Sequence, residues 1–216
     1  MSLLLAALLA SAACPSAATA EAAVCVALEA QKGGRFAEAA AAFETGAGRV
    51  KPGDPKADRM LAAAGNMWIA AGEPGKAALA LDKALGGSGL LADQRGLALI
   101  DRARAAEARN DLKTARAKLT EAMASAGEDP FAWYFSAALA VRENDLKRAE
   151  ADILKALTLA PGDGAILFEA GHIAQLNGDE PRARGLFQRA IAADPKGPGG
   201  IAAKKALDLL AAPTAK

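Results

Sequence analysis

The sequence predicts an all-α protein built from stacked, antiparallel helical hairpins. Apolar residues make up 52% of the 216-residue chain, yet only 4% of residues are aromatic, and alanine supplies much of the apolar share. Alanine is the strongest helix former, whereas strands favour β-branched and aromatic side chains. A spacing pattern that recurs along the chain, with turn residues placed regularly inside it, predicts the same fold class.

The second half of each predicted hairpin carries small and large residues at a fixed spacing. The small residues are Ala39, Ala77, Ala115, Ala149 and Ala183. A large apolar residue follows each of them at Phe43, Leu81, Leu119, Ile153 and Phe187, and a second small residue comes at Gly46, Ala84, Ala122, Ala156 and Ala190. Successive units are offset by 38, 38, 34 and 34 residues (77−39, 115−77, 149−115, 183−149). Residues three and four apart share one helix face, so the pattern predicts a close helix crossing in every unit.

The first half of each unit repeats as well. A small residue precedes the one above at Ala27, Gly65, Ala103, Ala137 and Gly171, and a turn residue stands between the halves at Gly34, Gly72, Asn110, Asn144 and Gly178. Pro161 and Pro195, which cannot continue a helix, close the last two units. Because one hairpin cannot bury its apolar face alone, the units are expected to stack.

This pattern resembles the tetratricopeptide repeat, a 34-residue helix-turn-helix unit, over residues 20–197. The segment from Pro130 to Asp163 matches best, with Trp133, Ala137 and Ala149 in register. The resemblance implies a right-handed superhelical solenoid with a capping helix over 198–212, and its units span about 20–53, 58–91, 96–129, 130–163 and 164–197. The two longer offsets are attributed to turn-rich surface loops.

The N-terminus is typical of a secretory signal. An apolar run from Leu3 to Ala13 is too short to span a bilayer, which takes about 20 residues. The small residues Ala18, Thr19 and Ala20 then predict cleavage before Glu21, so residues 1–20 are assigned to the signal peptide. No Lys or Arg precedes the run, and the alternative is a buried N-terminal helix in a cytoplasmic protein. We expect an exported, periplasmic protein.

The two cysteines leave alternatives open. The residues from Ser11 to Cys14 loosely resemble a bacterial lipobox, so a lipid anchor at Cys14 is an alternative to simple cleavage. Cleavage after Ala20 would leave Cys25 as the only thiol, and a single cysteine of this kind most often serves as a small, buried apolar residue.

Charge and motif content exclude several function classes. A net charge of +1, from 26 basic and 25 acidic residues, provides no basic stripe for nucleic acid. The single histidine excludes paired-histidine metal motifs, and the Gly75-Lys76 pair lacks the other residues of a phosphate-binding loop. We expect no enzymatic activity, no cofactor and no metal.

The resemblance also implies a binding surface, because the first helix of each family unit lines a concave groove. The positions that match are Asn66, Arg104, Phe131, Tyr134, Arg142, Phe168, His172 and Gln175. Rigid aromatic area beside arginine is typical of binding hot spots. The hypothesis is a protein-protein interaction scaffold or adaptor of the bacterial envelope, which holds an extended or helical peptide with Arg104 or Arg142 against a carboxylate. In the alternatives, the aromatic rings pack between repeats, or the chain is a self-associating structural solenoid.

Overall fold

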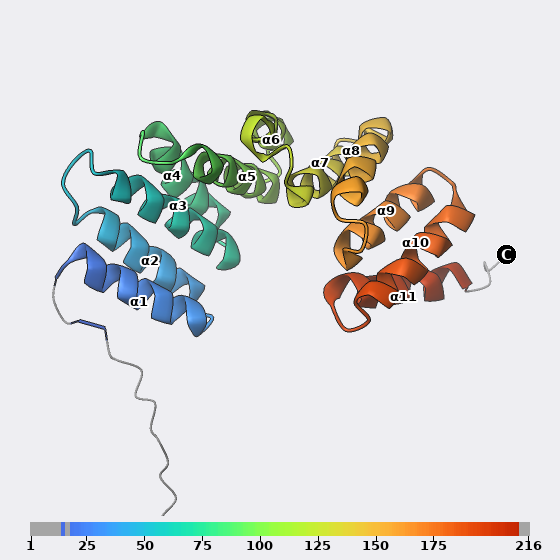
Figure 1. Cartoon of the computed structure of the whole chain (residues 1–216), viewed down its shortest axis with the longest axis horizontal. Helices are drawn as coiled ribbons and strands as arrows, with labels where there is room; N and C mark the ends of the chain where they lie inside the picture. Colours follow the sequence, from blue (N-terminus) through green and yellow to red (C-terminus); the bar gives the residue numbers. More distant parts are fainter. Residues whose placement is uncertain (1–13, 16–17, 212–216) are drawn as a thin grey trace, which may run out of the picture. The chain divides into compact units, whose positions relative to one another are not determined.

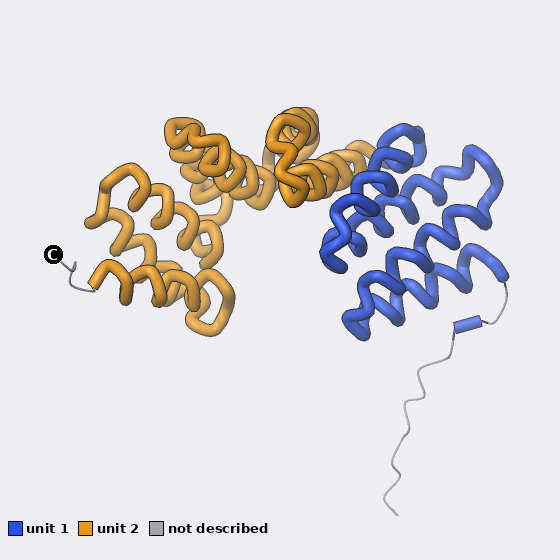
Figure 2. The backbone as a smooth tube through the Cα atoms, turned by 180° about the vertical axis from the view of Figure 1, so that it is seen from behind, with its two compact units in different colours: residues 1–90 blue, residues 91–216 orange. Residues whose placement is uncertain are grey.

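The computed structural model describes residues 14–15 and 18–211, and every regular element in these ranges is an α-helix. The chain divides into two compact units, Met1–Leu90 and Leu91–Lys216, which are coloured separately in Figure 2. Each unit is a stack of antiparallel helices.

The first unit contains two hairpins. Within it each helix packs against the next one along the chain, as Figure 1 shows. The helices are α1 (Ala20–Lys32), α2 (Phe36–Ala47), α3 (Pro55–Ala70) and α4 (Pro74–Gly86).

The second unit contains three hairpins and a final helix. Its helices are α5 (Ala92–Ala108), α6 (Leu112–Ala126), α7 (Pro130–Arg142), α8 (Leu146–Leu159), α9 (Gly164–Leu176), α10 (Glu180–Ala193) and α11 (Pro198–Ala211). Helix α11 packs on both α9 and α10, as expected of a helix that covers the apolar face of a terminal hairpin. None of the described helices is long and apolar enough to cross a membrane.

The turn inside each hairpin has one repeated geometry. Between α5 and α6, Asn110 adopts φ 60° and donates its N–H to the Glu107 carbonyl at 2.9 Å, while the Asp111 N–H donates to the Ala106 carbonyl at 2.9 Å. This pair of bonds satisfies carbonyls at the end of the first helix. The Asp111 carboxylate then accepts from the Thr114 N–H at 3.1 Å and begins the second helix. The left-handed residues of the five hairpin turns are those at the predicted turn positions: Gly34, Gly72, Asn110, Asn144 and Gly178.

The predicted helix crossings are buried. The first small residue of every second helix has no exposed surface, and the large residue that follows is buried in every unit. At two crossings the partner on the first helix is glycine, and an added Cβ would lie 2.3 Å from Leu81 Cγ at Gly65 and 2.6 Å from Phe187 Cδ1 at Gly171. The small residues therefore set how closely the two helices of a hairpin approach.

Part of each longer offset lies in helix, and the rest lies in the loops at residues 48–54 and 87–91. Helix α3 begins at Pro55 and α5 at Ala92, ahead of the positions 58 and 96 that the repeat pattern gives. Pro55 is favourable in the first turn, and the Asp54 carboxylate accepts from the Lys56 N–H at 2.9 Å. The turn-rich segments thus end earlier than the sequence pattern suggests.

Helix α11 also differs in which residues it buries. It begins at Pro198 and includes Gly199 and Gly200, where an added Cβ would lie 2.4 Å from the Gly164 carbonyl oxygen and 2.0 Å from the Asp194 carbonyl oxygen. The first large apolar residue of the helix, Ile201, is 59% exposed. The two glycines bring the backbone so close to the neighbouring turn that they occupy the inner face in place of Ile201.

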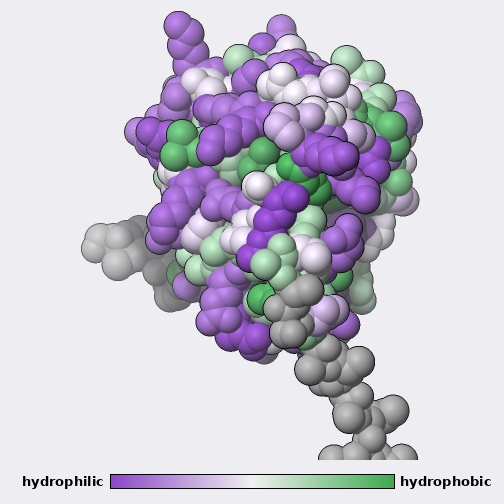
Figure 3. Space-filling view, turned by 90° about the vertical axis from the view of Figure 1, so that its left-hand side faces the viewer, coloured by the Kyte–Doolittle hydropathy of each residue, from purple (hydrophilic) through white to green (hydrophobic). Residues whose placement is uncertain are grey.

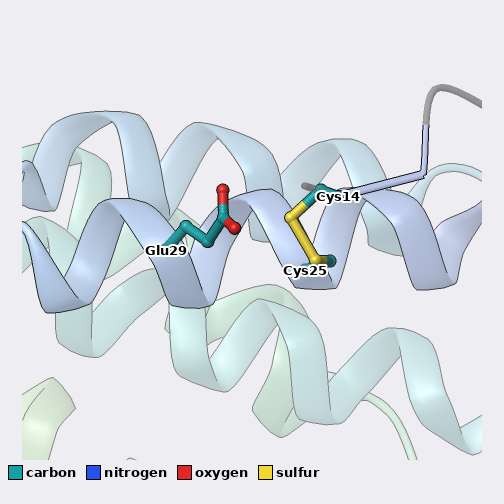
Figure 4. A group of neighbouring side chains, drawn as sticks. All are labelled: Cys14, Cys25 and Glu29. Carbon is teal, nitrogen blue, oxygen red and sulfur yellow. A yellow bond between two sulfur atoms is a disulfide. The ribbon is translucent and has the colours of Figure 1, made fainter. Parts of the chain in front are cut away.

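The cysteine interpretation needs correction. Cys25 is not a lone, buried thiol: it is half-buried on α1 and forms the disulfide with Cys14 that Figure 4 shows. The two Cα atoms are 5.6 Å apart. The predicted apolar signal run, up to Ala13, and the last residue of the predicted capping helix lie outside the described residues.

Candidate functional site

An aromatic surface lies on the first helices of the last two hairpins. We call Phe131 and Tyr134 on α7, together with Phe168 and His172 on α9, the aromatic strip. Phe131 lies 6.0 Å from Tyr134 between ring centroids, and Phe168 stacks on His172 at 6.4 Å. Phe131 is 42% exposed, and the other three members of the strip are half-buried. The strip thus exposes ring surface to solvent, while Tyr134 and Phe168 also pack against the hydrophobic core.

Helix geometry and capping place these rings on one face. Phe131 and Tyr134 are three residues apart and Phe168 and His172 four apart, so each pair shares a helix face. Asp129 begins α7 by accepting from the Phe131 N–H at 2.9 Å. Asp163 begins α9 by accepting from two backbone N–H groups, at 2.8 and 3.0 Å. The register of the strip is therefore fixed from the first turn of each helix.

Both arginines of the predicted site already have carboxylate partners within the chain. Arg142 donates to the Glu107 side chain, to the Glu107 carbonyl at 3.1 Å and to Asn110 Oδ1 at 2.9 Å, which joins α7 to α5. Arg104 donates to Asp101 Oδ1 at 2.9 Å, and its guanidinium lies 5.9 Å from the Phe131 ring centroid. Both guanidinium groups are thus neutralised locally, and Arg104 is the one that lies beside a ring of the strip.

A buried carboxylate lies beside the strip, and the sequence analysis did not single it out. Glu169 is 8% exposed, and its Oε1 lies 3.6 Å from His172 Nδ1. Interaction with the Glu169 side chain raises the pKa of His172 above its ordinary value, and burial opposes that effect only in part. Burial, followed by the charges of Glu169 and Asp163, raises the pKa of Tyr134. The shift of His172 arises mainly from Glu169, whereas that of Tyr134 arises mainly from burial, with a smaller contribution from the two carboxylates.

One feature of the sequence distinguishes Glu169 from the other acidic residues. Helix α9 is apolar over most of its length, and Glu169 is its only acidic residue. A lone carboxylate on an apolar helix is unusual, because a buried charge costs free energy unless it is paired. The sequence shows that Glu169 stands next to Phe168, but the repeat pattern does not predict that the Glu169 carboxylate is buried.

A polar network joins the hairpin of α5 and α6 to that of α7 and α8. Arg116 on α6 donates to the Glu143 carboxylate at 2.7 Å and to Ser136 Oγ at 2.7 Å, and the Ser136 hydroxyl donates to Asp152 Oδ2 at 2.6 Å. The side chains of Arg116 and Glu143 are only 18% and 21% exposed. This network holds neighbouring hairpins in register, and no repeat position predicts it.

Apolar residues elsewhere on the surface are scattered. The face of the molecule in Figure 3 is mostly hydrophilic, with small, separate apolar patches. In the first unit the exposed large apolar side chains are Val26, Leu28 and Leu79. Exposed apolar residues that occur singly are normal on protein surfaces.

The cysteine pair does not form a metal site. Cys14, Cys25 and Glu29, drawn in Figure 4, are neighbours, and their ligand atoms lie within 4.8 Å of one another. Both sulfur atoms are bonded to each other, so neither supplies the thiolate that a metal ion requires.

No protein-family model and no curated protein matches the sequence. Solved structures do match. The crystal structure of PilW, a widely conserved type IV pilus biogenesis factor, has a TM-score of 0.72 and 16% identity, covering 87% of this chain and 82% of PilW. YrrB, a TPR protein with an unusual peptide-binding site, has a TM-score of 0.61 and 18% identity, covering 86% of this chain and 92% of YrrB. The chain has the tetratricopeptide-repeat fold.

MamA from Desulfovibrio magneticus RS-1 has the same tetratricopeptide-repeat fold, with a TM-score of 0.67 at 18% identity over 83% of this chain and 97% of that one. The fold class predicted from the repeat pattern is therefore confirmed. At identities this low, the similarity concerns the fold alone.

The tetratricopeptide-repeat fold of the second unit brings most predicted site residues together. Arg104 lies over the Phe131 ring, Arg142 at the other end of α7 binds Glu107 of α5, and the Glu169 carboxylate acts on both Tyr134 of α7 and His172 of α9. Gln175 is exposed in the last turn of α9. Asn66 is half-buried on α3, in the first unit.

Proposed function

We propose that this chain is a protein-binding module and that the aromatic strip of α7 and α9 receives a segment of its partner. The observation that carries the proposal is the combination of exposed ring surface at Phe131 on α7 with the buried Glu169 carboxylate, which contacts His172 of the strip on α9. The fold supports a binding role, because the structurally similar YrrB is a TPR protein with a peptide-binding site and PilW takes part in pilus biogenesis.

The aromatic strip provides the apolar part of the contact. Phe131 is 42% exposed, and burying a phenylalanine side chain completely contributes about 1.5–3 kcal/mol. Phe131 also stacks on the buried Phe135 ring at 6.4 Å, which holds it rigid. A rigid ring loses little conformational freedom on binding, so most of this contribution is retained.

The charge pattern favours a basic partner segment. Arg104 and Arg142 are already paired with Asp101 and Glu107, so a carboxylate on the partner would compete with carboxylates of the chain itself. Among the described residues, Glu169 is instead paired with His172, at 3.6 Å. A lysine or arginine beside an apolar residue complements this surface, and we therefore revise the earlier expectation of an acidic partner group.

We further propose that the protein acts in the bacterial envelope. The apolar run from Leu3 to Ala13 is typical of an export signal. The disulfide between Cys14 and Cys25 supports the same location, because disulfides persist in oxidising compartments.

Selection from a random peptide display library on the purified, oxidised protein tests this function. We expect enriched peptides to combine lysine or arginine with an apolar or aromatic residue. Glu169→Gln, which keeps the side-chain shape, should weaken their binding at least about tenfold, as expected when a charged hydrogen-bonding partner is lost. The matched control is Glu121→Gln on α6, an exposed carboxylate on a second helix, which should leave binding unchanged.

Acidic peptides that bind Glu169→Gln and the wild type equally would refute the charge assignment. Peptides whose binding survives Phe131→Ala would refute the strip itself. Self-association as a structural solenoid is the alternative function, and Ile201 and Leu209 on α11 provide exposed apolar surface for it. A monomer by light scattering at micromolar concentration argues against it.

A further inference from the structure

We propose that the chain is cut between Ala13 and Cys14, and that the mature protein begins with Cys14 held in a disulfide to Cys25. This processing site replaces the cleavage after Ala20 that the sequence pattern predicts. The inference is independent of the binding function above, because it concerns only the N-terminal segment and the first hairpin.

Residues around the bond after Ala20 are part of the fold. Thr19 begins α1, and its hydroxyl oxygen accepts from the Ala22 N–H at 3.1 Å. The Thr19 carbonyl accepts from Arg49 Nη1 at 3.1 Å, which links the segment to the end of the first hairpin. Ala20 itself is only 8% exposed. Cleavage after Ala20 would remove the cap and one buried residue of the helix.

That cleavage would also create an unfavourable charge. The new α-ammonium group of Glu21 would lie in the first turn of α1. The N-terminal end of a helix carries partial positive charge, so a cation there is destabilising. Thr19 provides the opposite, a hydroxyl oxygen that accepts from a backbone N–H of the first turn.

The disulfide holds the segment before Thr19 against the first hairpin. Cys14 and Cys25 are separated by 11 residues, and the bond joins the segment to the middle of α1. Pro15 and Ala18 line a hollow of about 360 Å³ together with Val26 of α1, Thr45 of α2 and Arg49, which follows α2. Cys14, Pro15, Ala18 and Thr19 therefore belong to the first unit, and a mature chain that retains the disulfide must retain Cys14.

The residues just before Cys14 fit a processing site. Ser11 and Ala13 are small and stand three and one residues before the proposed bond, directly after the apolar run. A lipid anchor would use the same residue, but lipidation forms a thioether on the sulfur atom of Cys14. In the structure this sulfur is bonded to Cys25, so the disulfide and the lipid exclude each other.

The chemistry balances in two steps. Hydrolysis adds water across the Ala13–Cys14 peptide bond and leaves a carboxylate on Ala13 and an amine on Cys14. Oxidation then joins the two thiols with loss of two protons and two electrons, which a disulfide of the thiol–disulfide oxidoreductase class accepts in the receiving compartment.

Intact-mass and N-terminal analysis of the exported protein tests the proposal. The full chain is expressed in a bacterial host with a general secretory pathway, and the processed form is recovered from the envelope. We expect an N-terminus at Cys14, no thiol that reacts with iodoacetamide before reduction, and a mass that rises by two hydrogen atoms on reduction. An N-terminus at Glu21, an uncleaved chain, free thiols or a diacylglyceryl group on Cys14 would each overturn it.

Two leucine substitutions distinguish the two cleavage sites. Ala13→Leu places a bulky residue directly before the proposed bond and should leave the precursor uncleaved. Ala18→Leu blocks the alternative site, and because Ala18 is exposed the fold is spared, so processing should match the wild type. The reverse result refutes the assignment. In Cys25→Ser, cleavage should continue and the Cys14 thiol should become reactive.

Discussion

Replacing Gly171 by alanine tests the packing of the last hairpin. A Cβ atom at this position would lie 2.6 Å from both Cδ1 and Cε1 of Phe187, whereas carbon atoms in ordinary contact are about 3.5–4.0 Å apart. Phe187 is fully buried, so its ring has no free space into which to move. Overpacking of this kind costs about 1–3 kcal/mol.

Part of that cost is offset by helix propensity. Alanine is about 0.5–1 kcal/mol better than glycine inside a helix, so the net destabilisation should be about 0.5–2 kcal/mol. For a chain of this size, 1 kcal/mol corresponds to a shift of about 2–4 °C in Tm. Urea unfolding followed by far-UV circular dichroism measures the change directly.

Gly185→Ala on α10 is the matched control. No atom lies within 4 Å of a Cβ at this position, so the substitution should stabilise the protein by about 0.5–1 kcal/mol through propensity alone. The difference between the free energies of unfolding of the two variants gives the cost of the contact between the added Cβ atom and Phe187. Phe187→Leu in the Gly171→Ala background should recover stability, because the neighbouring hairpins pack alanine against Leu119 and Ile153. If Gly171→Ala stabilises as much as Gly185→Ala, the assigned packing of α9 against α10 at Gly171 and Phe187 is wrong.

Three further substitutions test other parts of the second unit. Arg116→Ala should destabilise by about 2–4 kcal/mol in urea unfolding, because it leaves the Glu143 carboxylate half-buried without its partner. Asp163→Ala should cost about 1 kcal/mol through loss of the α9 cap, measured in the same way. The raised pKa of His172 stabilises the fold fully below its unfolded value of about 6.5, and this contribution is lost as pH rises through the folded pKa. Glu169→Gln should remove that pH dependence, compared at about pH 5.5 and about pH 8.5.

Each of these predictions has a clear contrary result. Arg148→Ala removes an exposed pair with Asp145 and should change stability by less than about 0.5 kcal/mol, so an equal loss in Arg116→Ala and Arg148→Ala refutes the network. An unchanged unfolding midpoint in Asp163→Ala contradicts the capping assignment. A stability profile of Glu169→Gln with the wild-type slope near neutral pH contradicts the pairing with His172.

The repeat was predictable because it depends on local features. A helix crossing requires a small residue, and the turn between two helices requires a residue that tolerates positive φ. Both kinds of residue therefore recur at a fixed spacing in the sequence. Asn110 and Asn144 stand where other units have glycine, and both adopt the left-handed conformation that asparagine tolerates better than most residues. The helix pairs therefore follow from the sequence.

Features that join separate helices were not predictable in this way. The contact of Arg116 with Glu143 and Ser136 depends on how two hairpins face each other, and the sequence pattern contains no period for it. The pairing of Cys14 with Cys25 was missed because cleavage was placed between them. The burial of Glu169 depends on packing around α9. The binding role of the aromatic strip stays a prediction.

Hydrogen-exchange mass spectrometry with a selected basic peptide tests the central claim most directly. The account predicts that peptide binding slows amide exchange in α7 and α9, which carry the aromatic strip, and that Glu169→Gln abolishes this protection. Protection confined to α8 and α10, or to the helices of the first unit, would contradict it.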